Sequence, residues 1–209
     1  MLKRGFTLIE VLVTLVILMF GLLGIAGLMA KGQRASFEAY QRQQALALAN
    51  DMVERMRVNR LQSTAYAAGA PTATPLGLGV NYDDLITAVI TDCAAGNCSA
   101  AQLAAYDLAL WDGLLNGYTE RQAVGGLTIT SIVNPRGCIE EIANTVAACP
   151  AAPAPLNTFF TRTNRVSVSW QGNEDTAAPT TTTCGTGVYD AETRRRVVSL
   201  DMILQIPCP

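Results

Sequence analysis

The feature that most constrains this chain is an uncharged segment of twenty residues at positions 11–30. Most of these residues are apolar, and as a helix they rise about 30 Å, which matches the hydrocarbon core of a bilayer. Lys3 and Arg4 precede the segment and favour a cytoplasmic position for this end. We therefore expect one membrane-spanning helix near the amino terminus, with the rest of the chain on the other side of the membrane.

Two features distinguish this segment from a secretory signal peptide. Gly5 lies between the basic pair and the apolar run, so cleavage after it would remove only residues 1–5 and leave the helix attached. Glu10 places a carboxylate near the start of the helix. Because an unpaired carboxylate at mid-bilayer costs roughly 2.5–3.5 kcal/mol, we expect it to have a partner. The α-amino group that cleavage would create at Phe6 is a candidate, in the same chain or in a neighbour.

The sequence Lys-Arg-Gly followed by Phe-Thr-Leu-Ile-Glu resembles the prepilin signature of type IV pilins and type II secretion pseudopilins. The resemblance implies that prepilin peptidase cleaves after Gly5 and N-methylates Phe6. It also implies that Glu10 neutralises the terminal amine of a neighbouring subunit during filament assembly. The alternatives are a one-pass anchor and a signal cut after Ala30, although Leu28 fits poorly three positions before such a cut.

All six cysteines follow the apolar segment, where an oxidising periplasm permits disulfides. A zinc site is not expected, because the chain has no histidine and no Cys-x-x-Cys pair, and we expect no cofactor. Six cysteines allow fifteen pairings. We expect nearest neighbours to pair: Cys93 with Cys98, Cys138 with Cys149, and Cys184 with Cys208.

The helical pattern continues beyond the apolar run and predicts one long helix over residues 6–60. Its second half is amphipathic, with apolar residues from Ala45 to Met56 at spacings of three or four. Asp51 and Arg55 form an opposite-charge pair at a spacing of four. We therefore expect this domain order: a leader at 1–5, a membrane part at 6–30, an amphipathic part at 31–60 and a periplasmic globular domain at 61–209.

The globular part is expected to contain a second helix and a sheet. Residues 62–80 are interpreted as a small-residue loop, and Ser99 as the cap of a helix over residues 100–116. One face of that helix is expected in the core: Leu103, Tyr106, Leu110, Trp111 and Leu114. Strands are expected at 127–133, 165–170 and 195–206. The fold class is thus α+β, a long helix packed on one antiparallel sheet and stapled by disulfides, which the resemblance identifies with the type IV pilin fold.

Catalytic constellations are hard to find in this sequence. The absence of histidine excludes a Ser-His-Asp triad, and no Walker lysine motif is present, so we do not expect an enzyme. The paired acids Asp83-Asp84 and Glu140-Glu141 are interpreted as solvated charges of loops or helix ends rather than as a glycosidase pair.

Binding of nucleic acid or phosphate is not expected either. The only basic run, at residues 194–196, opens a predicted strand whose side chains alternate between two faces. The net charge of −2 becomes −4 once Lys3 and Arg4 are removed. A Gly77-x-Gly79 pair lacks the strand and helix pattern of a phosphate-binding loop.

A second, narrower resemblance is to the PilV family of minor type IV pilins. It is carried by residues 21–28, 49–57, 59–60 and 98–111. It implies a minor pilin of the inner membrane that enters a surface pilus and serves twitching motility and adhesion. The implied partners are prepilin peptidase, other minor pilins, the major pilin, the inner-membrane assembly platform and membrane lipid. A type II secretion minor pseudopilin, a DNA-uptake receptor pilin and a membrane-anchored periplasmic enzyme remain alternatives.

Overall fold

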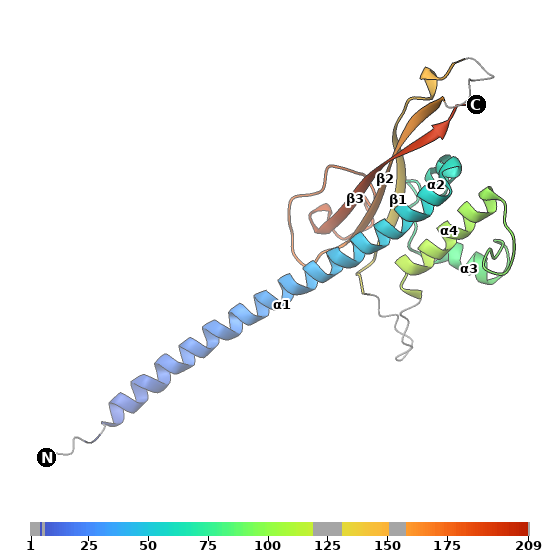
Figure 1. Ribbon diagram of the computed structural model, residues 1–209. Helices are drawn as coiled ribbons and strands as arrows, with labels where there is room; N and C mark the ends of the chain where they lie inside the picture. Colours follow the sequence, from blue (N-terminus) through green and yellow to red (C-terminus); the bar gives the residue numbers. More distant parts are fainter. Residues whose placement is uncertain (1–4, 6, 119–130, 151–157, 209) are drawn as a thin grey trace. The chain divides into compact units, whose positions relative to one another are not determined.

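A computed structural model describes residue 5 and residues 7–118, 131–150 and 158–208 of the chain (Figure 1). The chain forms two compact units, Met1–Tyr40 and Gln41–Pro209. The elements, in chain order, are α1 (Leu8–Val58), η1 (Arg60–Gln62), α2 (Ser63–Gly69), α3 (Val80–Ile86), α4 (Ala100–Leu115), β1 (Arg136–Asn144), η3 (Val146–Ala148), β2 (Phe159–Gln171), η4 (Glu192–Arg194) and β3 (Arg195–Pro207).

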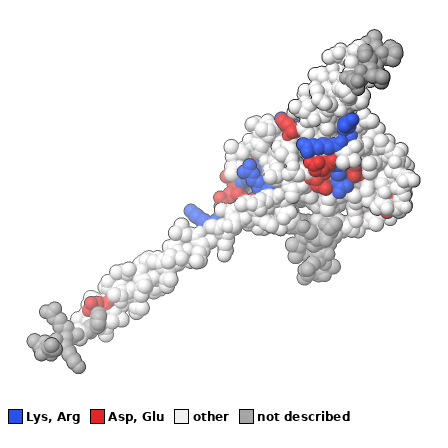
Figure 2. Space-filling model, viewed as in Figure 1, with Lys and Arg blue, Asp and Glu red and all other residues white. Residues whose placement is uncertain are grey.

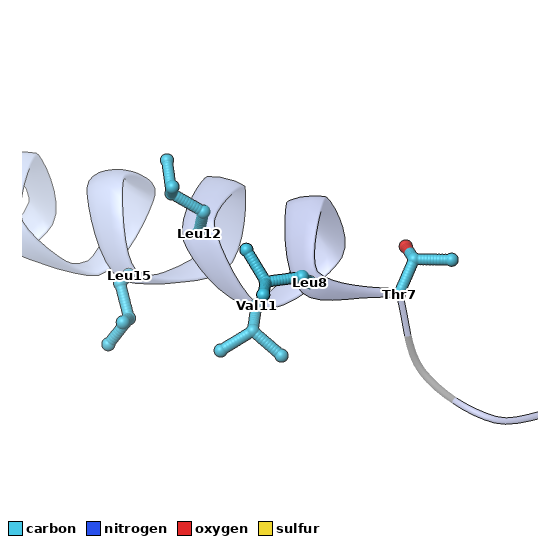
Figure 3. Close-up of a pocket in the computed structure, with 5 residues that line it drawn as sticks. All are labelled: Thr7, Leu8, Val11, Leu12 and Leu15. Atoms are coloured by element: carbon cyan, nitrogen blue, oxygen red, sulfur yellow. The ribbon is translucent and has the colours of Figure 1, made fainter.

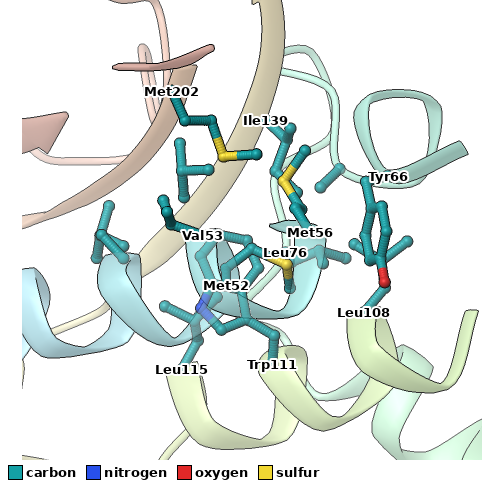
Figure 4. Packing of buried hydrophobic residues seen from close by; sticks show 14 of the residues in the cluster. Met52, Val53, Met56, Tyr66, Leu76, Leu108, Trp111, Leu115, Ile139 and Met202 are labelled. Atoms are coloured by element: carbon teal, nitrogen blue, oxygen red, sulfur yellow. The ribbon is translucent and has the colours of Figure 1, made fainter. Parts of the chain in front are cut away.

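The long helix α1 confirms the expected continuous helix. In the unit Gln41–Pro209 its buried side chains recur every three or four residues, which places them on one face. Ala45 and Ala49 are fully buried and belong to the same core cluster as buried residues of the sheet. Farther along, Met52 and Met56 fill the centre of the core (Figure 4).

The sheet is antiparallel, as expected, and has three strands in the order β1-β2-β3. Val166 of β2 lies opposite Ile139 of β1 and Leu200 of β3. Alternate residues of β2, including Val166, Val168 and Trp170, belong to the same core cluster as the buried face of α1. The apolar stripe of the helix is therefore buried against the sheet, which is the packing that the amphipathic pattern predicts.

Helix α4 covers another side of the core. A Cβ on Gly137 of β1 would lie 2.5 Å from atoms of Trp111 and Leu115, so only glycine permits this contact between helix and strand. The indole nitrogen of Trp111 donates a hydrogen bond to the carbonyl oxygen of Leu48 in α1 at 2.9 Å. Trp111 thus ties α4 to both the sheet and the long helix.

The expected inner face of α4 was wrong. Of the five residues assigned to it, Trp111 is buried and the other four are only partly buried. The helix instead buries the set Ala104, Asp107, Leu108, Ala109, Trp111, Asp112, Gly113 and Leu115. The face is rotated because two aspartates lie inside the protein, where internal hydrogen-bond donors satisfy them.

Two expected backbone assignments also need correction. Residues 62–80 are not one loop, because they include all of α2 and the first residue of α3, and α2 buries Tyr66 completely. The strand expected at 127–133 lies partly outside the described residues, and residues 131–133 are not in a strand. The strand begins instead just after Pro135, which lacks the N–H group that a strand interior needs.

The paired acids Glu140 and Glu141 lie in strand β1, not in a loop or at a helix end. Glu140 accepts a hydrogen bond from the Thr182 hydroxyl at 2.7 Å. Glu141 forms an ion pair of 2.7 Å with Arg162 of β2. Both carboxylates therefore have structural partners within the domain.

The expected disulfide pairing is right for one bridge and wrong for two. Cys93 is bonded to Cys98. The other bridges join Cys138 to Cys184 and Cys149 to Cys208, instead of Cys138 to Cys149 and Cys184 to Cys208.

Strand pairing explains the two longer bridges. Cys138 lies opposite Ser167, on the face of the sheet where Ser169 bonds to Tyr189 of the β2–β3 connection, which also carries Cys184. At the other end of the sheet, the amide of Cys208 donates to the carbonyl of Thr158, next to the β1–β2 connection. The antiparallel order therefore brings together cysteines that are far apart in the sequence.

Candidate processing and assembly site

The predicted cleavage position lies ahead of helix α1. Gly5 is exposed, and apart from its two neighbours in the chain no described residue lies within 4 Å of the point where its Cβ would be. Phe6, the predicted methylation site, lies outside the described residues. The helix starts at Leu8, where the carbonyl oxygen of Thr7 accepts the backbone N–H of Glu10 at 3.1 Å. Gly5 therefore occupies an open, non-helical position, which suits entry into a protease.

Glu10 lies in the first turn of α1, with its side chain exposed. A negative charge at this end is favourable, because the unsatisfied N–H groups of the first turn give it a partial positive charge. Within the described residues Glu10 forms no ion pair. The carboxylate is therefore available to a group that another molecule or the mature amino terminus supplies.

The apolar part of α1 is covered by nothing within the described chain. Its large side chains over residues 8–29 are between 42% and 83% exposed. Figure 2 shows an uncharged surface along this stretch, beginning just after the single acidic patch near the amino terminus. The helix is long and apolar enough to cross a membrane. So large an exposed apolar surface requires lipid or other apolar helices to cover it.

Apolar side chains are exposed at consecutive positions of this stretch, for example at residues 15–19, so they lie on all sides of the helix. Figure 3 shows five of the apolar part's first residues, which line one shallow hollow along the helix: Thr7, Leu8, Val11, Leu12 and Leu15. Because the hollow is formed by one exposed helix alone, it lacks the opposite wall that would enclose a small ligand. The arrangement suits contact with several neighbouring helices or lipid chains at once.

Two family models match the chain. The model of the prokaryotic N-terminal methylation motif matches residues 1–26, and the type IV pilin Tt1218 model matches residues 28–109. The chain is a type IV pilin-like prepilin. No curated protein and no solved structure matches the sequence. Type IV pilins are structural proteins, so this pilin-like chain has a structural role rather than an enzymatic one.

The two matches divide the pilin-like chain at the end of its apolar segment. The methylation motif covers Gly5, Phe6 and Glu10, and it is a motif of the kind that prepilin peptidase processes. The pilin model covers the rest of α1, then α2 and α3, and most of α4. The sheet lies outside both matches, and its place in the fold rests on the structure alone.

A buried polar cluster, formed by Arg55, Asn59, Tyr66 and Asp107, holds the helices of the matched region together. The Tyr66 hydroxyl donates to one oxygen of Asp107 at 2.5 Å, and Arg55 donates to the other at 3.0 Å. Asn59 donates to the carbonyl oxygen of Ala100 at 2.7 Å. Burial and the hydrogen bond to Asp107 raise the pKa of Tyr66 above its usual value. The cluster joins the end of α1 to α2 and α4.

Asp112 forms a second buried centre, which we call the Asp112 cradle. Its carboxylate accepts the backbone N–H groups of Gly77 at 2.6 Å, Gly79 at 3.2 Å, Asn81 at 2.9 Å and Tyr82 at 3.4 Å. Gly77 and Gly79 have φ angles of 116° and 82°, which suit glycine and turn these groups toward one point. The N–H groups that a phosphate would need are thus bound to an internal carboxylate.

The basic run at residues 194–196 is also used internally. Arg195 is 4% exposed and donates to the carbonyl oxygens of Thr182 at 3.0 Å and Pro179 at 3.0 Å. Arg194 forms an ion pair with Asp175 at 3.2 Å. These side chains hold the β2–β3 connection and do not form an open basic surface.

Sequence reasoning missed Asp107 and Asp112, because aspartates in a helix are usually assigned to its exposed face. For Asp112 a signal was present in the glycine pair, whose converging N–H groups require an anion. Within the described residues no group of three or more histidines, cysteines, aspartates or glutamates could hold a metal ion.

Proposed function

We propose that this chain is a minor pilin of the type IV pilus. It is cleaved after Gly5, methylated at Phe6 by prepilin peptidase, and incorporated into pili, where it acts in assembly and priming and so in twitching motility and adhesion. The observation that carries the proposal is the exposed apolar surface of α1 at residues 8–29, which directly follows a methylation motif. A helix bundle in a filament core covers that surface once the protein leaves the membrane.

Glu10 serves as the assembly charge in this proposal. It is the first charged side chain after the predicted cleavage position, and its carboxylate has no ion-pair partner within the described residues. The amine of a methylated Phe6 in a neighbouring subunit supplies the opposite charge. In an apolar filament core such a pair is favoured strongly over an isolated carboxylate.

The assignment as a minor pilin is supported by the resemblance to the PilV family. Its segment at residues 49–57 includes Arg55, which the structure places in the buried polar cluster with Asp107. The segment at 98–111 includes Asp107 itself and the capping residue Ser99. The resemblance therefore falls on residues that hold α1 and α4 together.

The proposed topology has the amino terminus in the cytoplasm and the disulfide-bonded domain in the periplasm of a bacterium. Lys3 and Arg4 support the orientation, and three disulfides support an oxidising compartment. We propose a leader at 1–5, a membrane part at 6–30, an amphipathic part at 31–60 and a globular domain at 61–209. The compact unit that starts at Gln41 includes the end of the amphipathic part.

The proposal is tested with two variants in cells that make pili. Glu10→Ala should be cleaved normally but be absent from sheared pili, because the filament would lose its charge pair. Glu54→Ala, which changes an exposed acid on the same helix, is the matched control and should enter pili normally. Gly5→Val should retain its first five residues and stay in the membrane. Normal pili containing the uncut protein would contradict the proposal.

A type II secretion pseudopilin is the second candidate, because the methylation motif at residues 1–26 is compatible with both systems. Co-purification decides between them. Recovery with pilins supports the first assignment, whereas recovery with secretion proteins and absence from pili supports the second.

A further inference from the structure

A surface pocket of about 350 Å³ lies between α3, α4 and the connection closed by the Cys93–Cys98 disulfide. Its walls include Tyr82 and Ile86 from α3, Asp92 and Ala94 from the connection, and Tyr106 and Leu110 from α4. Two aromatic rings, aliphatic side chains and one carboxylate therefore share a single cavity. None of the functions proposed above uses it.

The pocket is held in shape by its surroundings. The Tyr82 ring lies directly against Gly113, where a Cβ would come within 2.4 Å of the ring. Its other neighbour is the ring of Tyr118, with the two ring centroids 4.1 Å apart. The carboxylate of Asp92 accepts the backbone N–H of Ala94 at 2.9 Å, which fixes the start of the disulfide loop.

The α4 side of the pocket is fixed as well. Ser99 and Gln102 form a capping box at the start of α4, and the Gln102 side chain also donates to the Thr91 hydroxyl at 3.4 Å. Burial and the nearby Asp92 carboxylate raise the pKa of Tyr106. The aromatic and acidic groups are therefore positioned before anything binds, which lowers the entropic cost of binding.

The segment that forms the pocket, residues 61–120, carries negative side chains and no positive ones. Between Arg60 and Arg121 the sequence contains no lysine, arginine or histidine, but it contains six acidic residues. Two of these, Asp107 and Asp112, are buried and satisfied internally. Three more lie at α3 and the disulfide loop, namely Asp83, Asp84 and Asp92. In the part of the chain that the structure describes, no basic side chain forms an ion pair with any of the three.

We propose that this pocket receives a lysine or arginine side chain from a neighbouring pilin-like subunit in the filament. The aliphatic stem of such a side chain would lie along Ile86 and Leu110, and its charged end would meet Asp92 and the tyrosine rings. A carboxylate partner is disfavoured because the surrounding charge is negative. The inference rests on the proposed incorporation into a filament and adds a specific contact to it.

The test places a photo-crosslinking residue at position 86, because Ile86 is 57% exposed at the pocket. In cells that assemble filaments, the expected product is a covalent adduct with another pilin-like subunit, attached near a lysine or arginine of that subunit. Asp92→Asn should reduce the adduct about five-fold, because it removes the charge but keeps an oxygen for the Ala94 N–H. Ala94→Phe should reduce it too, by filling the cavity.

Asp83→Asn is the matched control, since it removes an exposed charge from α3 that does not line the pocket. It should reduce the adduct much less than Asp92→Asn does, because its charge acts only from outside the pocket. An absent adduct, an adduct unaffected by Asp92→Asn, or one formed with a protein that is not pilin-like would each overturn the inference. Immunoblots of sheared pili distinguish a failure of this inference from a failure of the proposed function. If the protein is present in pili but forms no adduct, only the contact proposed at the pocket is refuted. If the protein is absent from pili, its assignment as a pilus subunit is refuted.

Discussion

The carboxylate of Asp112 in α4 lies 2.6 Å from the backbone nitrogen of Gly77. Gly77 belongs to the turn before α3, so the bond connects two parts of the chain that are 35 residues apart. Because Asp112 is 1% exposed, water does not compete for the carboxylate. This relationship determines the position of α3 on α4 and so shapes the surface pocket beside them.

Asp112→Ala should therefore destabilise the domain strongly. The change leaves several buried N–H groups without an acceptor, and we expect a loss of about 3 kcal/mol or more in the free energy of unfolding. Denaturant unfolding of the full chain in detergent measures it. Asp83→Asn, an exposed control on α3, should unfold like the wild type. Equal midpoints for Asp112→Ala and the wild type would refute the structural role of the cradle.

The buried polar cluster makes a second prediction. Tyr66→Phe removes the hydroxyl that donates to Asp107, while Arg55 remains as the other partner of that carboxylate. We expect a loss of about 1–3 kcal/mol in unfolding free energy. Tyr40→Phe is the matched control, because Tyr40 is 47% exposed and its hydroxyl can bond to water. Equal losses of unfolding free energy in the two variants would contradict a stabilising role for the bond between Tyr66 and Asp107.

The sequence predicted those elements whose pattern is local. Strand β2 was expected from the alternation of Val166, Val168 and Trp170, and α1 from its uninterrupted apolar and amphipathic periodicity. The face of α4 was not predictable in this way, because Asp107 and Asp112 are inside only by virtue of partners on other elements. These two aspartates are buried because hydrogen bonds from other elements satisfy them, although charged residues of a helix usually face the solvent.

The predicted processing site and the surface pocket differ in how far apart their residues lie in the sequence. The predicted cleavage position at Gly5 and the acid at Glu10 lie within one short motif, so local sequence was enough to predict them. The surface pocket combines Tyr82, Asp92 and Tyr106 from three separate segments. Only the packing of α3 on α4 brings these residues together, so no local pattern could have shown the pocket.

The disulfide connectivity makes a third prediction. Under non-reducing digestion, peptides containing Cys138 and Cys184 should be joined, as should those containing Cys149 and Cys208. Detection of a Cys138–Cys149 bridge in the native protein would contradict the structure.

The bridges should also differ in their contribution to stability. The bridge between Cys138 and Cys184 spans 46 residues, whereas that between Cys93 and Cys98 spans 5. In the chain-entropy model the longer loop contributes about 4 kcal/mol and the shorter about 2 kcal/mol. Replacing each pair by alanine and measuring denaturant unfolding compares them. A larger loss for the short loop would contradict the entropic account.

The cross-strand pair of Arg165 and Asp201 makes a prediction about pH. Arg165 lies opposite Asp201, and its guanidinium donates to both carboxylate oxygens, at 2.7 and 2.9 Å. This hydrogen bonding holds the pKa of Asp201 below its usual 3.8. A carboxyl with a lowered folded pKa stabilises the protein above its unfolded pKa, and the effect disappears as the pH falls through the folded value.

Asp201→Asn should accordingly lower stability at pH 7, by about 0.2–1 kcal/mol because the pair is partly exposed. The difference from the wild type should shrink as the pH falls below 3.8. Unfolding midpoints measured from pH 7 to pH 2 test this. High salt should also reduce the difference at pH 7, through screening of the pair. A difference in stability that grows as the pH falls would contradict a lowered pKa for Asp201.

The most direct test of the central claim is the intact mass of the protein recovered from sheared pili. The account predicts a chain that begins with an N-methylated Phe6, keeps its apolar helix, and has all six cysteines in disulfides. A soluble species that begins after Ala30, or one that retains residues 1–5 in the filament, would contradict it.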